Sequence, residues 1–232
     1  MNGWITRLRY GFKPMGLCSH CDGCAAPFTV EHGLSCKKGG LVSIRHDDVR
    51  DEAGVLAGQA LTNGKVTYEP SISYGRNLTV GQPDVQQGTG NQLGAEARGD
   101  VLVHGLWERG SGCVLDIRIT DTDANSYKDI SSAKVLERAA KAKKAKYLQA
   151  CLDRRRSFTP LVYSVSGMAC KEAKAFEKRI TCLLAEKWDR PYSEMVGYVR
   201  GRMGMAVIRS NTVLLRGARV DKRTVPWLWD DA

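Results

Sequence analysis

The chain has 232 residues, which is enough for one hydrophobic core with small additions, because single domains usually contain about 100 to 200 residues. Hydrophobic residues make up 43% of it and charged residues 26%, a balance that argues against overall disorder. No stretch approaches the roughly 20 apolar residues of a membrane span, and the first residues lack the apolar core of a signal peptide. We therefore expect a soluble, intracellular protein without a membrane partner.

The net positive charge of the chain indicates which kind of molecule it could bind. The formal net charge is +10 and the isoelectric point is about 9.3, so the folded surface must carry an excess of Lys and Arg that attracts polyanions. Nucleic acid is therefore the first partner to consider. Many basic proteins bind nothing specific, so the motifs have to decide between these two interpretations.

The first half of the chain is expected to contain a metal-bound segment, a helix, a strand and a long loop. Residues 16–40 are rich in Cys and Gly and poor in apolar residues, so a metal rather than a core would hold them. Apolar positions recur at helical spacing over residues 43–61, which predicts a helix that ends in a turn at Asn63-Gly64. Residues 65–72 alternate as a strand, and the stretch that follows, 75–99, is dense in Gly, Gln and Asn and predicts a long hairpin loop.

The second half predicts a hairpin, a helix, a further strand and two more helices. Residues 100–107 and 113–120 are rich in β-branched and apolar residues and are joined by a turn-like segment. A helix is expected over 131–155, capped by Ser131 or Ser132, and a strand over 158–165. Two amphipathic helices that can cover a sheet face are predicted from apolar positions at helical spacing, which are Ala173, Phe176, Ile180, Leu183 and Leu184 in one and Met195, Val199, Met203, Ala206 and Val207 in the other. The order helix, three strands, helix, strand indicates an α/β protein.

Four Cys and His residues near the N-terminus have the spacing of a structural zinc site. The pattern Cys21-x2-Cys24-x7-His32-x3-Cys36 offers the ligands that tetrahedral zinc needs at about 2.0 to 2.3 Å, with no open position for catalysis. Cys18 precedes Cys21 by the same interval, so either pair could start the site, and we prefer Cys21 and Cys24 because they lie nearer His32. Free thiols in a loop are the alternative. The other cysteines lie among apolar neighbours and are expected to be buried thiols of a reducing compartment: Cys113, Cys151, Cys170 and Cys182.

Two aspartates in the predicted hairpin could form a magnesium site. Alternation in the strand 113–120 places Asp116 and Arg118 on one face, and Asp100 begins the neighbouring strand. Two adjacent carboxylates bind Mg²⁺ through hard oxygen ligands. The alternative is that Asp100 caps a turn and that Asp116 pairs with Arg118.

A lysine interrupts the apolar side of the helix predicted to follow. Steps of 100° per residue place Leu136, Ala140, Lys143, Tyr147 and Cys151 on one stripe. A lysine is rarely buried without a partner, so Lys143 predicts a carboxylate or phosphate opposite it. The other lysines of this segment are expected on a solvated or phosphate-contacting face: Lys141, Lys144 and Lys146.

Taken together, these motifs resemble the restriction-like endonuclease domain at the C-terminus of site-specific non-LTR retrotransposon proteins, a branch of the PD-(D/E)XK nuclease superfamily. The family pattern is a Cys-Cys-His-Cys knuckle, an Arg-His pair that opens a helix, a Pro-Asp, a second Asp and a Lys-x2-Lys-Tyr. The chain has the corresponding residues in that order, from residue 18 to about 165: Cys21, Cys24, His32 and Cys36, then Arg45-His46, Asp100, Asp116 and Lys143-x2-Lys146-Tyr147. Gly99 replaces the Pro, and Arg118 stands where many superfamily members have the last-motif Lys, which implies that Lys143 on the helix replaces it.

The resemblance implies a metal-dependent DNA endonuclease with a restriction-endonuclease-like core and a mixed sheet. Asp100 and Asp116 would hold Mg²⁺, and Lys143 would orient water or neutralise a phosphate. An acid of the first helix often completes such a site, and Asp48, Asp51 and Glu52 are unranked candidates. Arg45 and His46 would contact DNA or tie the knuckle to the core. The DNA-contacting residues implied by the resemblance are Arg45, His46, Arg118, Lys146 and Tyr147.

The resemblance also implies how the chain is divided into segments, which partners it has and where in the cell it acts. The expected segments are a knuckle over residues 1–40, a nuclease core over 41–168 and a helical extension over 169–232. The expected partners are DNA and retroelement RNA or a reverse transcriptase, in the nucleus. A catalytically inactive, zinc-stabilised DNA-binding remnant of a retroelement protein is the alternative, and only the nuclease needs a divalent metal for turnover.

Overall fold

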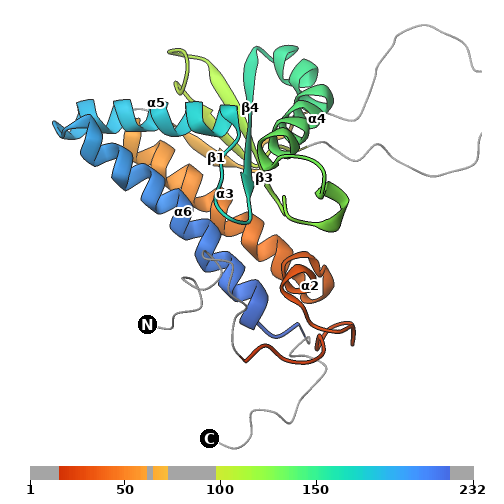
Figure 1. The fold of residues 1–232 in the computed structure, drawn as a ribbon. Helices are drawn as coiled ribbons and strands as arrows, with labels where there is room; N and C mark the ends of the chain where they lie inside the picture. The colour runs from red at the N-terminus through yellow and green to blue at the C-terminus, as the bar shows by residue number, and fades with distance from the viewer. Residues whose placement is uncertain (1–15, 62–64, 73–97, 220–232) are drawn as a thin grey trace, which may run out of the picture.

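The structure is a computed structural model that describes residues 16–61, 65–72 and 98–219 (Figure 1). It confirms the α/β class and the order helix, three strands, helix, strand. These elements are α3 (Leu41–Ala60), β1 (Val66–Tyr68), β2 (Val101–His104), β3 (Gly112–Thr120), α4 (Ser132–Leu152) and β4 (Arg156–Ser164). The remaining elements are α2 (Val30–Ser35), α5 (Lys171–Trp188), α6 (Tyr192–Arg216) and the short 3-10 turns η1 (Lys38–Gly40) and η2 (Asn125–Tyr127).

The sheet is mixed, with strand order β1-β2-β3-β4. The first three strands are antiparallel neighbours, with Val101 opposite Leu115. The last pair, β3 and β4, is parallel, with Asp116 opposite Pro160. A parallel pair needs a long crossover, which α4 supplies, and this crossover brings the helix back across the sheet.

Helices cover both faces of the sheet. Figure 1 shows α4 on one side and α3, α5 and α6 on the other. Along β3, Leu115 and Ile117 join the main core with α3, whereas Val114 packs with Cys151 of α4. The alternation predicted for this strand is therefore confirmed, and Asp116 lies on the α4 side with Val114.

The strand expected over 65–72 is shorter and spans only Val66–Tyr68. Two other predicted boundaries move for local reasons. The strand expected over 100–107 ends at His104, because Gly105 adopts a positive φ of 82° and turns the chain. The helix expected over 131–155 ends at Leu152, and a turn with Arg155 at φ 53° leads into β4. The predicted turn at Asn63-Gly64 and nearly all of the predicted loop 75–99 lie outside the described residues.

The C-terminal helices are confirmed, but they do not both cover the sheet. α5 packs on β4, whereas α6 packs mainly on α3 and α5 as a further layer. The end of α6 reaches the knuckle, where Leu214 and Leu215 share a hydrophobic cluster with Phe28 and Leu34. Residues from all three expected segments thus contribute to shared hydrophobic clusters. No helix among the described residues has the length and apolar content needed to cross a membrane.

Candidate functional site

The knuckle is shaped by short-range backbone contacts. A tight turn joins the amide of Cys21 to the carbonyl of Ala26 at 2.8 Å. Thr29 then caps α2 by accepting a hydrogen bond from the amide of His32 at 3.1 Å, and Cys36 ends the helix. A turn followed by one capped helical turn therefore directs His32 and Cys36 back toward the first two cysteines.

The four predicted ligands converge on one point. Cys36 Sγ lies 3.8 Å from Cys21 Sγ and 3.9 Å from Cys24 Sγ, and Cys24 Sγ lies 3.3 Å from His32 Nε2. Thiolates about 2.3 Å from a tetrahedral zinc ion would be about 3.8 Å apart, which matches these separations. All four ligand atoms lie within 4.8 Å of one another, and Cys18 is not in the group. These four residues can hold a metal ion, and their chemistry fits zinc.

The surroundings of Cys21 also favour a metal-bound thiolate at this one ligand. Burial raises the pKa of the Cys21 thiol, but hydrogen bonds with His32 and with the backbone of Gly23 and Cys24 outweigh it and lower the pKa to about 6. A thiol with a lowered pKa is largely ionised at neutral pH, and the thiolate is the form that binds metal.

Arg219, which follows α6, contacts the knuckle through its side chain and its backbone. The guanidinium of Arg219 lies 5.0 Å from the Phe28 ring and donates to the carbonyl of Gly33 at 2.9 Å. The backbone amide of Arg219 donates to Asp22 Oδ2 at 2.6 Å. Gly39 passes so close to Arg219 that a Cβ there would lie 2.5 Å from its Cα. The knuckle and the end of α6 therefore pack as one unit.

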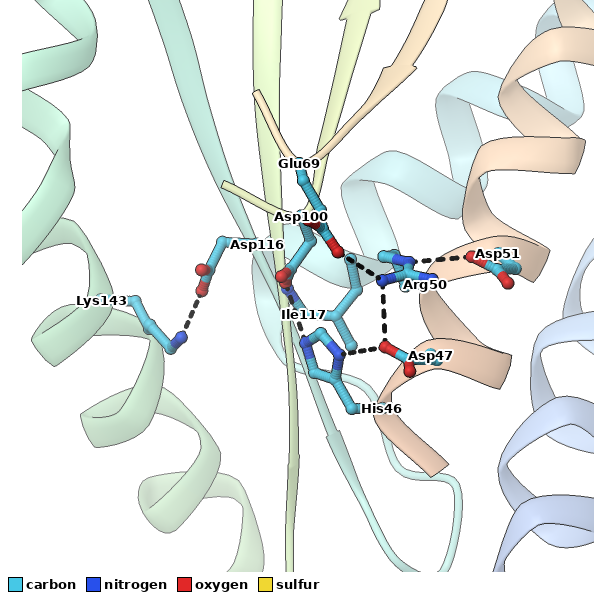
Figure 2. A network of polar contacts seen from close by, with 9 residues as sticks. All are labelled: His46, Asp47, Arg50, Asp51, Glu69, Asp100, Asp116, Ile117 and Lys143. Carbon is cyan, nitrogen blue, oxygen red and sulfur yellow. Dashed lines mark hydrogen bonds and ion pairs between the residues drawn. The ribbon is translucent and has the colours of Figure 1, made fainter. Parts of the chain in front are cut away.

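A second site lies between α3, β3 and α4. Lys143 Nζ is 2.6 Å from Asp116 Oδ2, and the Asp116 side chain is only 5% exposed (Figure 2). Burial raises the pKa of Asp116 above its ordinary value; Lys143 and His46 oppose this rise, and Asp100 adds to it. Asp116 therefore pairs with Lys143, as the helical stripe predicts, and a neighbouring carboxylate adds negative potential.

Asp100 extends the pairing between β2 and β3. Its backbone amide donates to the carbonyl of Leu115 at 3.1 Å, and its Oδ2 accepts a hydrogen bond from the amide of Ile117 at 2.5 Å. The carboxylate thus takes the place of the next strand carbonyl. Gly99 precedes it and donates its own amide to the carbonyl of Pro70, and a Cβ at this residue would overlap Val114 Cγ1. A proline at residue 99 would lose that hydrogen bond and meet Val114, which explains why this chain has glycine there.

The helix α3 supplies a histidine to this site rather than an acid. His46 Nε2 lies 3.1 Å from Asp100 Oδ2, and this hydrogen bond raises the pKa of His46. Its Nδ1 lies 3.3 Å from Asp47 Oδ1, and Asp47 is paired with Arg50 at 3.0 Å. Figure 2 shows His46 and Lys143 on opposite sides of the two aspartates.

The acids expected from this helix have other surroundings. Glu52 pairs with Arg202 of α6 at 2.5 Å, and Asp51 pairs with Arg50 at 2.8 Å. Asp48 is partly exposed, and the α3 side chain that contacts Asp100 is His46. The resemblance implies that His46 contacts DNA or ties the knuckle to the core, whereas the structure places it against Asp100. No local sequence signal indicates this contact, because His46 and Asp100 are 54 positions apart.

The other predicted DNA-contacting residues lie in different environments. Arg45 is buried and donates to Asn211 Oδ1 of α6 at 3.3 Å, so its guanidinium faces the protein interior and ties α3 to α6. Arg118 is partly exposed, and its Nε donates to Thr120 Oγ1 at 3.2 Å. Lys146 is exposed and lies 4.8 Å from the centre of the partly exposed Tyr147 ring. Lys146 is therefore the predicted DNA-contacting residue most open to solvent.

The expectations for Lys144 and Cys182 are wrong. Lys144 is not simply solvated: it pairs with Glu172 at the start of α5, at 2.5 Å. Cys182 was expected to be buried and is exposed, whereas Cys113, Cys151 and Cys170 are buried. Cys182 lies on the outer face of the amphipathic helix α5, where a short apolar side chain can meet solvent.

The knuckle and the carboxylate site differ in how closely their possible metal ligands are grouped. Within the described ranges, the knuckle is the only set of three or more His, Cys, Asp or Glu residues whose ligand atoms all lie within 4.8 Å of one another. Asp100, Asp116 and His46 interact electrostatically, but their ligand atoms do not form such a group in this arrangement, in which Lys143 pairs with Asp116. No protein-family model and no curated protein matches this sequence.

Proposed function

We propose that the protein is a metal-dependent DNA endonuclease of the restriction-like type found in site-specific non-LTR retrotransposon proteins, acting in the nucleus during retroelement integration. Asp100, Asp116 and Lys143 form its active site, and the zinc knuckle supports the fold. Three features support the proposal: the mixed sheet with its helical crossover, the basic charge of +10, and the motif order from the knuckle to Tyr147.

One contact carries the proposal. Lys143 projects from an otherwise apolar stripe of α4 and meets Asp116, a buried carboxylate of β3, at 2.6 Å. Burying a lone charge is unfavourable, and a simple packing role would be filled better by apolar residues. A buried acid, a second acid beside it and a lysine within reach are the groups that phosphodiester hydrolysis needs.

The donor set fits a divalent cation at this site. Asp116 has a pKa that burial raises, and Asp100 lies near enough to raise it further, so a positive charge would stabilise both ionised carboxylates. Such a cation, when bound, supplies Lewis-acid activation of water and neutralises charge on the phosphate. Asp100 is held rigidly by the Ile117 amide, and Lys143 can donate hydrogen bonds to a phosphate oxygen or to the attacking water.

A nicking assay tests this function. Supercoiled plasmid is incubated with zinc-loaded protein, with and without added Mg²⁺ or Mn²⁺, because a strong chelator would also strip the knuckle. The proposal expects nicking only with added metal and none for Asp116→Asn. Equal nicking by both proteins would show a contaminating nuclease and overturn the assignment.

A DNA-binding module without catalysis is the second candidate. It is favoured by the engagement of both carboxylates with other groups of the protein, Asp100 with Ile117 and His46 and Asp116 with Lys143. This candidate expects DNA binding that does not change with added metal and no nicking under any condition.

A further inference from the structure

His46 occupies the position beside the carboxylates where an acid of the first helix was expected. Its Nε2 lies 3.1 Å from Asp100 Oδ2. Two donors at adjacent positions around one metal, each about 2.1 Å from it, are separated by about 3 Å. The imidazole nitrogen and the carboxylate oxygen are therefore as far apart as two neighbouring ligands of one ion.

A second carboxylate orients the imidazole ring. Asp47 Oδ1 lies 3.3 Å from His46 Nδ1, and Arg50 holds Asp47 at 3.0 Å. Histidines that bind metals usually donate their other ring N–H to a carboxylate or carbonyl, which fixes the tautomer and the ring orientation. An imidazole that served a DNA phosphate would present a nitrogen to solvent, whereas both nitrogens of His46 face carboxylates (Figure 2).

We infer that His46 is a metal ligand of the carboxylate site, beside Asp100 and Asp116, and that Asp47 orients it. The inference rests on the proposed function, because it concerns the same site, and it adds the class of metal. A site with one imidazole and two carboxylates selects Mn²⁺ over Mg²⁺, because nitrogen donors bind transition metals better than they bind Mg²⁺.

Mn²⁺ provides a direct test that does not require cleavage. The zinc-loaded full chain is titrated with Mn²⁺, and the bound ion is examined by electron spin-echo envelope modulation, which detects a directly coordinated imidazole nitrogen. Zinc in the knuckle is diamagnetic and silent. The wild type should show the nitrogen signal. His46→Gln should lose the signal, and His104→Gln, at the opposite end of β2 from Asp100, should keep it.

Affinity gives a second measurement on a protein that retains His46. Asp47→Asn should weaken Mn²⁺ binding by about 10- to 100-fold, the usual effect of losing a carboxylate that orients a metal-bound histidine. Competition with Mg²⁺ should leave Mn²⁺ bound at equal concentrations of the two ions. Asp47→Asn keeps every proposed ligand, so its result is informative even if His46→Gln does not fold.

The outcomes separate this inference from the nuclease proposal. Bound Mn²⁺ without a nitrogen signal, in a protein that nicks DNA, overturns the role of His46 and leaves the nuclease assignment intact. A nitrogen signal in a protein that never nicks DNA supports the ligand and overturns the nuclease. No Mn²⁺ binding outside the knuckle overturns the inference, and nicking with Mg²⁺ then decides the function separately.

Discussion

Lys143 Nζ lies 2.6 Å from Asp116 Oδ2, so a side chain from the crossover helix meets a carboxylate from the strand that it crosses. The pair joins α4 to β3 on the face of the sheet where Val114 packs with Cys151 of α4. Lys144, the next residue, points elsewhere and pairs with Glu172 of α5 at 2.5 Å. These two adjacent lysines are matched in chemistry and differ in position, which makes them a useful pair of variants.

Removal of Lys143 should abolish most cleavage while leaving DNA binding. Lys143→Ala should reduce metal-dependent nicking by about 10²- to 10⁴-fold, the usual contribution of a group that moves or holds a proton in the transition state. Lys144→Ala should leave nicking unchanged and lower the melting temperature slightly, because its ion pair is partly exposed. Plasmid nicking and DNA affinity are measured for both variants.

Arg118→Ala provides the contrasting case in the same assay. Arg118 shares its strand face with Asp116 and donates to Thr120, and an arginine does not exchange protons readily at neutral pH. Its loss should affect nicking only through positioning. Loss of nicking in Arg118→Ala with normal nicking in Lys143→Ala would place the site within the strand and contradict the role of Lys143.

The contribution of Asp116 to the stability of the fold should become less favourable as the pH rises. Its pKa is raised in the folded protein, mainly by burial, so the folded state holds the proton more tightly than the unfolded state. The penalty is absent below the ordinary pKa of a carboxyl and fully present above the raised one. Asp116→Asn should therefore melt at a higher temperature than the wild type at pH 7, with a smaller difference at pH 4.5. A difference that shrinks as the pH rises would contradict this assignment.

The knuckle should bind one zinc ion per chain. Cys24→Ser combined with His32→Ala should remove the zinc and destabilise the fold, because the ligands hold a segment with little core of its own. Cys18→Ser should keep full zinc content, since Cys18 lies outside the ligand group. Metal analysis of purified proteins measures this. Equal zinc in the wild type and the double variant would rule the site out.

Two neighbouring glycines should respond differently to alanine. Gly39 and Gly40 both have a positive φ, 71° and 70°, which costs an alanine about 1 to 2 kcal/mol. Around Gly40 the space is open, whereas a Cβ at Gly39 would lie 2.5 Å from Arg219 Cα. Gly40→Ala should therefore show only the backbone cost in urea unfolding, and Gly39→Ala should be destabilised further. Equal destabilisation would mean that Arg219 is not packed against the knuckle in solution.

DNA binding should fall steeply with salt and depend on the α4 side of the protein. The triple alanine variant of Lys141, Lys146 and Arg155, all exposed, should flatten the plot of log affinity against log salt by about 0.9 for each phosphate that is no longer neutralised. A triple alanine variant of exposed α5 lysines, at Lys171, Lys174 and Lys178, removes the same charge from another helix and should change the slope less. Equal effects would indicate binding by net charge alone.

The sequence by itself determined the elements and their contents. Helical and strand periodicities are set by residues two to four positions apart, so the order of elements, the inward direction of Lys143 and the alternation around Asp116 could be predicted without tertiary information. The knuckle ligands could also be predicted, because Cys21 and Cys36 are only 15 residues apart. Over so short a segment, the sequence spacing of the ligands indicates the metal site directly.

Only the tertiary structure decided which side chains meet across the fold. His46 and Asp100 are 54 positions apart, and their contact depends on how α3 crosses the start of β2, which no local pattern encodes. The same holds for Arg45, which looks like a surface cation in the sequence and is buried against Asn211, 166 positions away. Long-range pairings follow from the packing of whole elements, where small differences in helix position decide between a buried partner and solvent.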